Sequence, residues 1–95
     1  MKWYKNLAWI VKFKESAKKE LSKLDKPIAK KLVIFLQQLS NCDDPRHKGK
    51  QLKGKLKDFW RYRVSDYRII TKITDQEITI LVLKVAHRKD VYEDQ

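Results

Sequence analysis

The sequence has few of the residues that most catalytic and cofactor motifs require. It contains one cysteine, two histidines, two glycines and two prolines in 95 residues. A lone Cys42 cannot form a disulfide within the chain and fits a reducing compartment. Gly49 and Gly54 are not followed by the Lys-Ser/Thr of a phosphate-binding loop, so nucleotide hydrolysis is not expected. The His and Cys residues lack metal-ligand spacing, and we expect neither a metal nor another cofactor.

Long apolar runs are also missing. The longest, such as Leu32–Leu36 and Ile78–Leu83, are too short to cross a bilayer. The first residues, Met-Lys-Trp-Tyr-Lys-Asn, lack the apolar stretch of a signal peptide. We therefore expect a cytoplasmic protein with no membrane contact.

Acidic residues are scarce relative to basic ones. Twelve Asp and Glu stand against 23 Lys and Arg, which gives a formal net charge of +11. Hydrophobic residues make up 42% of the chain and include three Trp, four Tyr and three Phe, which indicates a folded domain and not a disordered basic tail. Residues 1–95 are expected to form one domain whose partner is a polyanion, either nucleic acid or an acidic protein.

The hydrophobic pattern predicts strands and two helices. Residues 7–13 are predicted to form a first strand with Trp9, Val11 and Phe13 on one face. Apolar residues at helical spacing predict one helix over residues 16–24 and a second ending near Ser40. The second helix is expected to be capped by Asp25 and to carry Pro27 in its first turn. Residues 41–50 read as a loop.

The segment from Phe59 to Ile73 is typical of a β-hairpin. It is rich in β-branched and aromatic residues on both sides of Ser65-Asp66, which we interpret as a tight turn. Strand alternation puts Arg61 and Arg63 on one face, and closure of the turn puts Arg63 opposite Arg68. Facing like charges destabilise a sheet, so this arrangement suggests an anionic ligand.

Basic residues continue upstream of the hairpin. Between Arg46 and Arg63 the sequence has eight Lys or Arg against one acid, Asp58. Lys50, Lys53, Lys55 and Lys57 are therefore candidates for substrate binding. After a turn at residues 74–77, a last strand is predicted over residues 78–86. The predicted fold class is α+β: a strand, a two-helix hairpin and a three-stranded antiparallel meander forming a small antiparallel sheet, with the helices on one face.

Several of these segments resemble the RelE/ParE superfamily of bacterial toxins. The resemblance lies in Leu52-Lys-Gly54, in Trp-Arg-Tyr-Arg-Val with Asp-Tyr-Arg68, and in His87-Arg-Lys-Asp-Val-Tyr92, and it is strongest for the RelE-like branch. It implies the toxin of a type II toxin–antitoxin system that cleaves messenger RNA (mRNA) in the ribosomal A site, without a metal, through the 2′-hydroxyl. It also implies a cognate antitoxin, contacts with ribosomal RNA (rRNA), and operator DNA bound by the complex through the antitoxin.

The resemblance also assigns roles by position. Its catalytic residues fall on Arg61, Arg63, Arg68, Arg88 and Tyr92, and Lys53 matches a residue that helps to hold RNA. The family pattern has lysines where Arg61 and Arg63 stand here. Arginine does not lose its proton in proteins, so the general base is expected to be Tyr92, with His87 as substitute or helper.

Other readings stay open for these residues. Arg61 and Arg63 could be solvated positions on an exposed face, and Arg68 could pair with Asp58 or Glu77. His87 could be a hydrogen-bonding residue at a strand end, Tyr92 could pack on the sheet, and the lysines could be a solvated basic loop. The chain as a whole could be a ParE-like toxin that acts on DNA gyrase, or a non-catalytic RNA-binding module.

Overall fold

The computed structural model describes residues 8–56 and 58–87. These residues form five strands, two α-helices and two short 3₁₀ helices. In chain order they are β1 (Ile10–Phe13), α1 (Glu15–Ser22), α2 (Lys26–Ser40), η2 (Pro45–Lys48), β2 (Lys50–Gln51), η3 (Gly54–Leu56), β3 (Phe59–Val64), β4 (Tyr67–Thr74) and β5 (Thr79–His87). The expected α+β class is confirmed, and within the described residues neither helix is long and apolar enough to cross a membrane.

The five strands form one mixed sheet in the order β1-β5-β4-β3-β2. Strands β2 to β5 pair antiparallel as a meander. Strand β1 pairs parallel with β5, with Ile10 opposite Thr79 and Phe13 opposite Val82. The expectation of a purely antiparallel sheet was therefore wrong in this one pairing. Strand β1 is separated from the meander by the two helices, and the last strand of the meander, β5, comes to lie beside β1 in the same direction.

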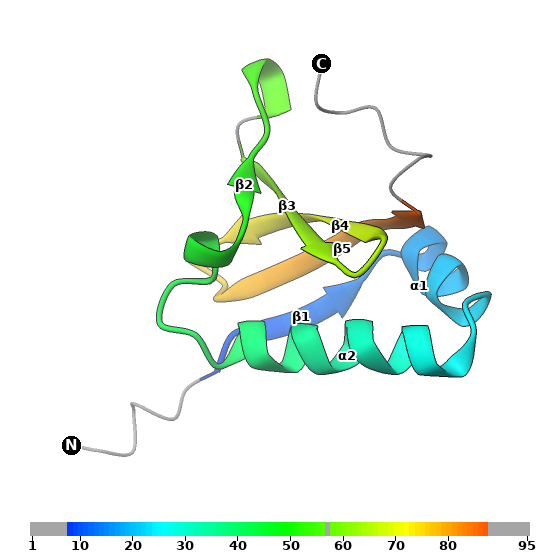
Figure 1. Cartoon of the computed structure of the whole chain (residues 1–95). Coiled ribbons are helices and arrows are strands. Elements are labelled where there is room, and N and C mark those ends of the chain that lie inside the picture. The colour runs from blue at the N-terminus through cyan, green and yellow to red at the C-terminus, as the bar shows by residue number, and fades with distance from the viewer. Residues whose placement is uncertain (1–7, 57, 88–95) are drawn as a thin grey trace.

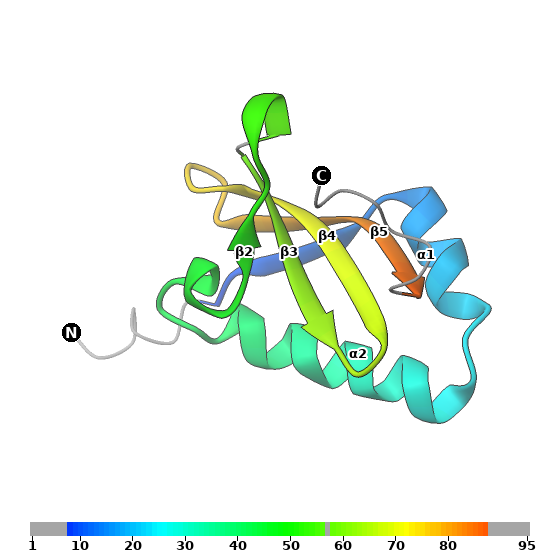
Figure 2. The same ribbon diagram turned by 45° about the horizontal axis from the view of Figure 1, so that its top comes forward.

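Both helices cover the same face of the sheet. Figure 1 shows α2 running along β1, with the shorter α1 beside the end of β5, and in the tilted view of Figure 2 strands β3 and β4 lie in front of α2. Leu32, Leu36 and Leu39 of α2 pack with Tyr62 and Ile69 of the sheet in the hydrophobic core. Pro27 lies in the first turn of α2 as predicted, but the side chain of Asp25 makes no capping hydrogen bond.

Helix α1 closes an edge that β1 leaves uncovered. Strand β1 ends opposite Val82, so β5 continues beyond it, and no other strand of residues 8–56 and 58–87 pairs with it on that side. The carboxylate of Glu20 accepts a hydrogen bond from the Val85 N–H at 2.8 Å and lies 3.6 Å from Lys84 Nζ. An unpaired strand edge invites association with other chains, and the side chain of Glu20 reduces that exposure.

The segment expected to be a loop, residues 41–50, has more structure than its composition predicts. Asp44 caps η2 by accepting a hydrogen bond from the Arg46 N–H at 3.1 Å. The chain then enters β2, where Lys50 pairs with Arg61 and Gln51 with Trp60. Two residues are too short to produce a detectable alternation, and strand pairing with β3 is what defines β2.

The β4–β5 turn contains a residue in an unfavourable conformation. Ile78 has φ of +50°, in the left-handed region that β-branched residues rarely adopt, and its side chain is 40% exposed. Its carbonyl accepts a hydrogen bond from the Ile10 N–H at 2.7 Å, which fixes the start of β1. The turn geometry therefore prevails over the side-chain preference.

Replacing Ile78 with glycine is expected to stabilise the protein. The left-handed conformation costs a residue with a Cβ about 1–2 kcal/mol, and the larger entropy of glycine in the unfolded chain offsets about half of this. Thermal unfolding should show a rise in Tm of a few degrees for Ile78→Gly. Ile78→Val keeps the branched Cβ and should show no rise. A lower Tm for Ile78→Gly than for Ile78→Val would contradict this account.

Candidate functional site

Three arginines and a lysine share the face of the sheet opposite to the helices. In β3, Tyr62 and Val64 belong to or pack on the core, so Arg61 and Arg63 point the other way. Arg63 lies directly across from Arg68, as the sequence predicted, and Lys50 lies across from Arg61. Cross-strand neighbours have Cβ atoms about 4.5–5.5 Å apart, so four positive side chains gather over three adjacent strands.

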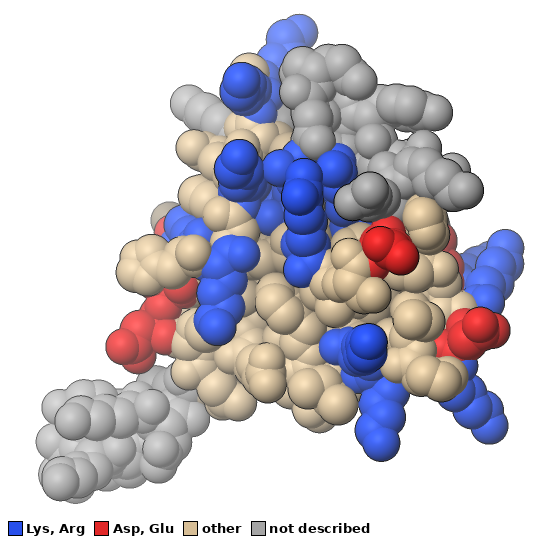
Figure 3. Space-filling view, viewed as in Figure 1, with Lys and Arg blue, Asp and Glu red and all other residues tan. Residues whose placement is uncertain are grey.

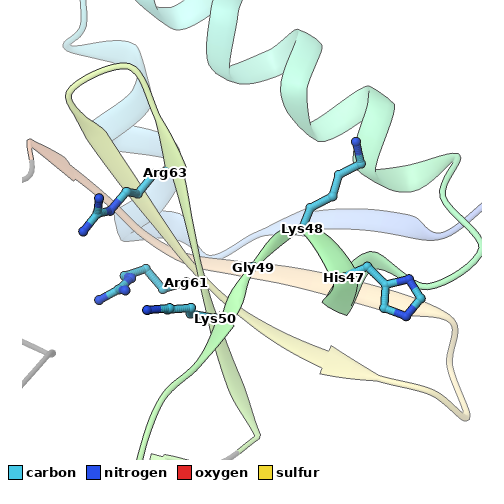
Figure 4. Close-up of a pocket in the computed structure, with 6 residues that line it drawn as sticks. All are labelled: His47, Lys48, Gly49, Lys50, Arg61 and Arg63. Carbon is cyan, nitrogen blue, oxygen red and sulfur yellow. The ribbon is translucent and has the colours of Figure 1, made fainter.

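Three of these four residues, Lys50, Arg61 and Arg63, line an open cavity of about 310 Å³, which His47, Lys48 and Gly49 also line. Figure 4 shows Lys50, Arg61 and Arg63 extending toward the same region, whereas His47 and Lys48 point away from it. Figure 3 shows that Lys and Arg side chains gather over β2 and β3 on this face. We call Lys50, Arg61, Arg63 and Arg68 the basic face.

Burial makes the basic face more than a solvated charge cluster. Arg61 is only 9% exposed and Arg68 is half-buried, while Arg63 and Lys50 are exposed. Charges removed from water interact more strongly with a ligand than charges in bulk solvent, and holding them together destabilises the fold. For Arg61 this burial argues against a simple solvated position.

Packing beneath β2 sets the position of Lys50. The hydroxyl of Tyr62 donates a hydrogen bond to the Pro45 carbonyl at 2.9 Å, and its ring lies under Gly49. On the other side of Lys50, the Leu52 N–H donates to the Phe59 carbonyl at 3.0 Å and the Leu52 side chain is buried. Burial raises the pKa of Tyr62 to about 12, so this tyrosine stays protonated at neutral pH. Its role is structural.

His87 lies on the other side of the sheet from the basic face. It pairs with Tyr67, which packs against the core, and the two rings meet edge to face with centroids 5.2 Å apart. The cause is a β-bulge: Ile70 pairs with Lys84 and Thr71 with Val82, so one residue of β5 is unmatched. The bulge reverses the alternation, and His87 faces the helices instead of the basic face.

The remaining predicted residues divide into two groups. Lys53, just before η3, and Lys55, within η3, are both exposed, and η3 projects beyond the sheet in Figures 1 and 2. Lys57, Arg88 and Tyr92 lie outside the described residues. The sequence analysis missed the positioning contributions of Gly49 and Tyr62. The alternation of β3 could have indicated that Tyr62 lies beneath the loop, but nothing in the sequence marks its contact with Gly49.

The basic face can bind and stabilise anionic oxygens. Guanidinium groups form paired hydrogen bonds with phosphate oxygens and favour a transition state that carries more negative charge than the ground state. Among residues 8–56 and 58–87, no cluster of three His, Cys, Asp or Glu side chains could hold a metal ion. The chemistry that these described residues offer is charge stabilisation by fixed cations.

Comparisons with known proteins agree with this fold. The sequence model of the ParE toxin of type II toxin–antitoxin systems matches residues 11–92. A RelE-like toxin protein of Escherichia coli is 36% identical over 86 residues, covering 86% of this chain and 87% of its own length. Toxin RelG of Mycobacterium tuberculosis is 32% identical over 87 residues, covering 90% and 98%.

Solved structures show the same architecture. The M. tuberculosis RelBE2 toxin–antitoxin complex includes a chain that matches with a TM-score of 0.77 and 31% identity, covering 86% of this chain and 93% of that one. The isolated E. coli RelE toxin matches in fold with a TM-score of 0.72 over 84% of each chain. The chain belongs to the RelE/ParE superfamily of type II toxins, in its RelE-like branch.

Proposed function

We propose that this toxin is a ribosome-dependent endoribonuclease that cleaves mRNA in the A site by attack of the ribose 2′-hydroxyl on the adjacent phosphate. The observation that carries the proposal is the basic face, with Arg63 directly opposite Arg68 and Lys50 directly opposite Arg61. This set suits a phosphate that gains charge during reaction. A ParE-like action on gyrase gives no comparable reason to bury Arg61 among like charges.

In the proposed reaction the 2′-oxygen forms a bond to phosphorus and the bond from phosphorus to the 5′-oxygen breaks. The products are a 2′,3′-cyclic phosphate and a 5′-hydroxyl. Arg61, Arg63 and Arg68 hold the phosphate and stabilise its added charge, and Arg88 assists them. Tyr92, as its phenolate, accepts the proton of the 2′-hydroxyl, because arginines do not accept protons at neutral pH, and the departing 5′-oxygen takes a proton from water. No metal or other cofactor takes part. The position of His87 beside Tyr67 favours Tyr92 over His87 for this role.

The same proposal assigns the partners. Lys50, Lys53, Lys55 and Lys57 contact mRNA or rRNA and make binding dependent on salt. The RelE chains of M. tuberculosis and E. coli are found in toxin–antitoxin complexes, and we infer a cognate antitoxin here, acidic where it meets a chain of charge +11. The complex binds operator DNA through the antitoxin, and the toxin acts in the cytoplasm.

Mapping mRNA 5′ ends after induction of the toxin tests the function. The expected result is new 5′ ends confined to translated reading frames, together with growth arrest. Growth arrest without mRNA cleavage, accompanied by trapped gyrase–DNA complexes, would support the ParE-like alternative instead. RNA binding without growth arrest or cleavage would leave only a binding module.

Tyr92→Phe tests the proton transfer. This change removes the hydroxyl and keeps the ring, so it should lower single-turnover cleavage on ribosomes by about 10²–10⁴-fold, the range for a positioned acid or base. The matched variant His87→Gln should cleave within a few-fold of the parent, since His87 faces away from the basic face. If His87→Gln is the slower variant, the two roles are exchanged.

A further inference from the structure

Arg46 is the first residue of the basic segment, residues 46–63, and its guanidinium is bound by two carboxylates. Its Nη2 donates to Asp75 Oδ2 at 2.8 Å, and its Nη1 donates to Asp44 Oδ1 at 3.3 Å. The side chain is 27% exposed, whereas that of the adjacent His47 is 82% exposed. The charge of Arg46 is therefore balanced by two carboxylates, and its guanidinium is held in place on two sides.

The Arg46–Asp75 pair connects two parts of the chain that are 29 residues apart in sequence. Arg46 is in η2, which leads through Gly49 directly into Lys50. Asp75 is in the β4–β5 turn, which is itself closed by a hydrogen bond from the Ile78 N–H to the Asp75 carbonyl at 3.0 Å. The pair thus connects η2, which precedes Lys50, to the β4–β5 turn.

Asp44 completes this arrangement. Its carboxylate accepts hydrogen bonds from both the backbone and the side chain of Arg46, and chiefly the backbone bond lowers the pKa of Asp44. Together with the bond from Tyr62 to Pro45, these contacts hold η2 at each of its first two residues. Lys50 follows four residues after Arg46, so a displacement of η2 would move Lys50 relative to Arg61.

We propose that Arg46, with Asp44 and Asp75, is a positioning residue that sets the geometry of the basic face and does not itself contact RNA. The proposal rests on the function proposed above, in which the basic face binds RNA. In this proposal the cations of the basic face bind RNA, and Arg46 instead keeps η2 and Lys50 in position. Displacements of about 1 Å in an active site can cost on the order of 10²-fold in rate.

Changing Asp75 gives opposite expectations for the two possible roles of Arg46. Asp75→Asn removes a negative charge and leaves Arg46 with one carboxylate fewer. If Arg46 were an RNA ligand, the freed guanidinium should strengthen ribosome binding. If Arg46 positions the loop, Asp75→Asn should lower single-turnover cleavage, by about tenfold, although the protein has become more positive.

The full experiment compares Arg46→Ala, Arg46→Lys, Asp75→Asn and the double variant Arg46→Ala/Asp75→Asn on programmed ribosomes. Arg46→Ala should slow cleavage at least as much as Asp75→Asn, and the double variant should be no slower than Arg46→Ala, because both single changes remove the Arg46–Asp75 pair. Arg46→Lys keeps an ion pair with Asp75 and should recover part of the rate. The salt dependence of ribosome binding should be unchanged by Arg46→Ala, whereas Lys50→Ala should reduce its slope by about 1.

Amide hydrogen exchange tests the effect of the Arg46 contacts on β2 in the protein without ribosomes. In Arg46→Ala, the amide of Leu52, which bonds to the Phe59 carbonyl, should exchange faster relative to amides of β4 and β5. Stronger binding by Asp75→Asn, or a slope for Arg46→Ala that falls as it does for Lys50→Ala, would overturn the proposal. Unchanged exchange and cleavage in Arg46→Ala would also overturn it. A parent that does not cleave mRNA, with exchange altered as expected, would refute the ribonuclease function and retain the positioning contact.

Discussion

Replacing Arg68 with alanine is expected to lower the single-turnover rate of mRNA cleavage on ribosomes by about 10²–10³-fold, the usual loss for one transition-state contact. Arg68 is half-buried on the central strand β4, directly across from Arg63. Its side chain therefore starts beside that of Arg63 on the same face of the sheet, and in the proposed reaction the two cations meet the phosphate that gains charge. Ribosome binding should change little, because the ground-state RNA has many other cationic contacts.

Two variants separate the effects of charge and geometry. Arg68→Lys keeps the positive charge but loses the planar pair of donors, so its rate should lie between those of the parent and Arg68→Ala. Lys55→Ala removes an exposed charge on η3 and should weaken ribosome binding and reduce its salt dependence without slowing the bound complex. Cleavage at the parental rate by Arg68→Ala would assign Arg68 a structural role, such as an ion pair within the sheet.

The sequence predicted the parts of this site that depend on local periodicity. Alternation along β3 and a two-residue turn are enough to place Arg63 opposite Arg68, and the helical spacing of Leu32, Leu36 and Leu39 is enough to define α2. Both features depend only on residues that are close in sequence, within one helix or within two strands joined by a tight turn. They were therefore visible before any tertiary contact was known.

Features that depend on long-range pairing were not predictable in this way. The side of the sheet that His87 faces depends on one unmatched residue in β5, and a single-residue bulge leaves no sign in the hydrophobic pattern. The Arg46–Asp75 pair joins residues 29 apart, and neither residue has a distinctive spacing. Strand β2 exists only because β3 offers it an edge. In each case tertiary structure supplies information that the local sequence lacks.

The two glycines show the same limit. In sequence, Gly49 and Gly54 look alike, both lying in the basic segment and neither belonging to a phosphate-binding motif. In the structure, Gly49 has an ordinary extended backbone but closely approaches the ring of Tyr62. Gly54 has φ of +67°, and a Cβ added to it would meet no atom within 4 Å. One glycine is required by contact and the other by backbone conformation, so alanine should have different effects at the two positions.

Gly49→Ala is expected to destabilise the protein by about 2–3 kcal/mol, the upper part of the range for overpacking. A Cβ at position 49 would lie 2.6 Å from Tyr62 Cε2 and 2.9 Å from the Arg61 carbonyl oxygen. Neither neighbour can move easily. The Tyr62 ring is 1% exposed, bonded to Pro45 and packed against Phe35 with centroids 5.7 Å apart, and the Arg61 carbonyl belongs to β3.

The strain in Gly49→Ala should be relieved by lifting the loop, which separates Lys50 from Arg61. Cleavage should therefore fall even at temperatures where the variant remains folded. Gly54→Ala is the matched control: it meets no atom within 4 Å and should cost only the left-handed conformation, about 1 kcal/mol. A double-mutant cycle with Tyr62→Leu, which removes the aromatic edge, should show a smaller cost of Gly49→Ala in the Tyr62→Leu background. Urea unfolding of the four proteins measures this coupling, and equal costs in both backgrounds would show that contact with Tyr62 is not what requires glycine at position 49.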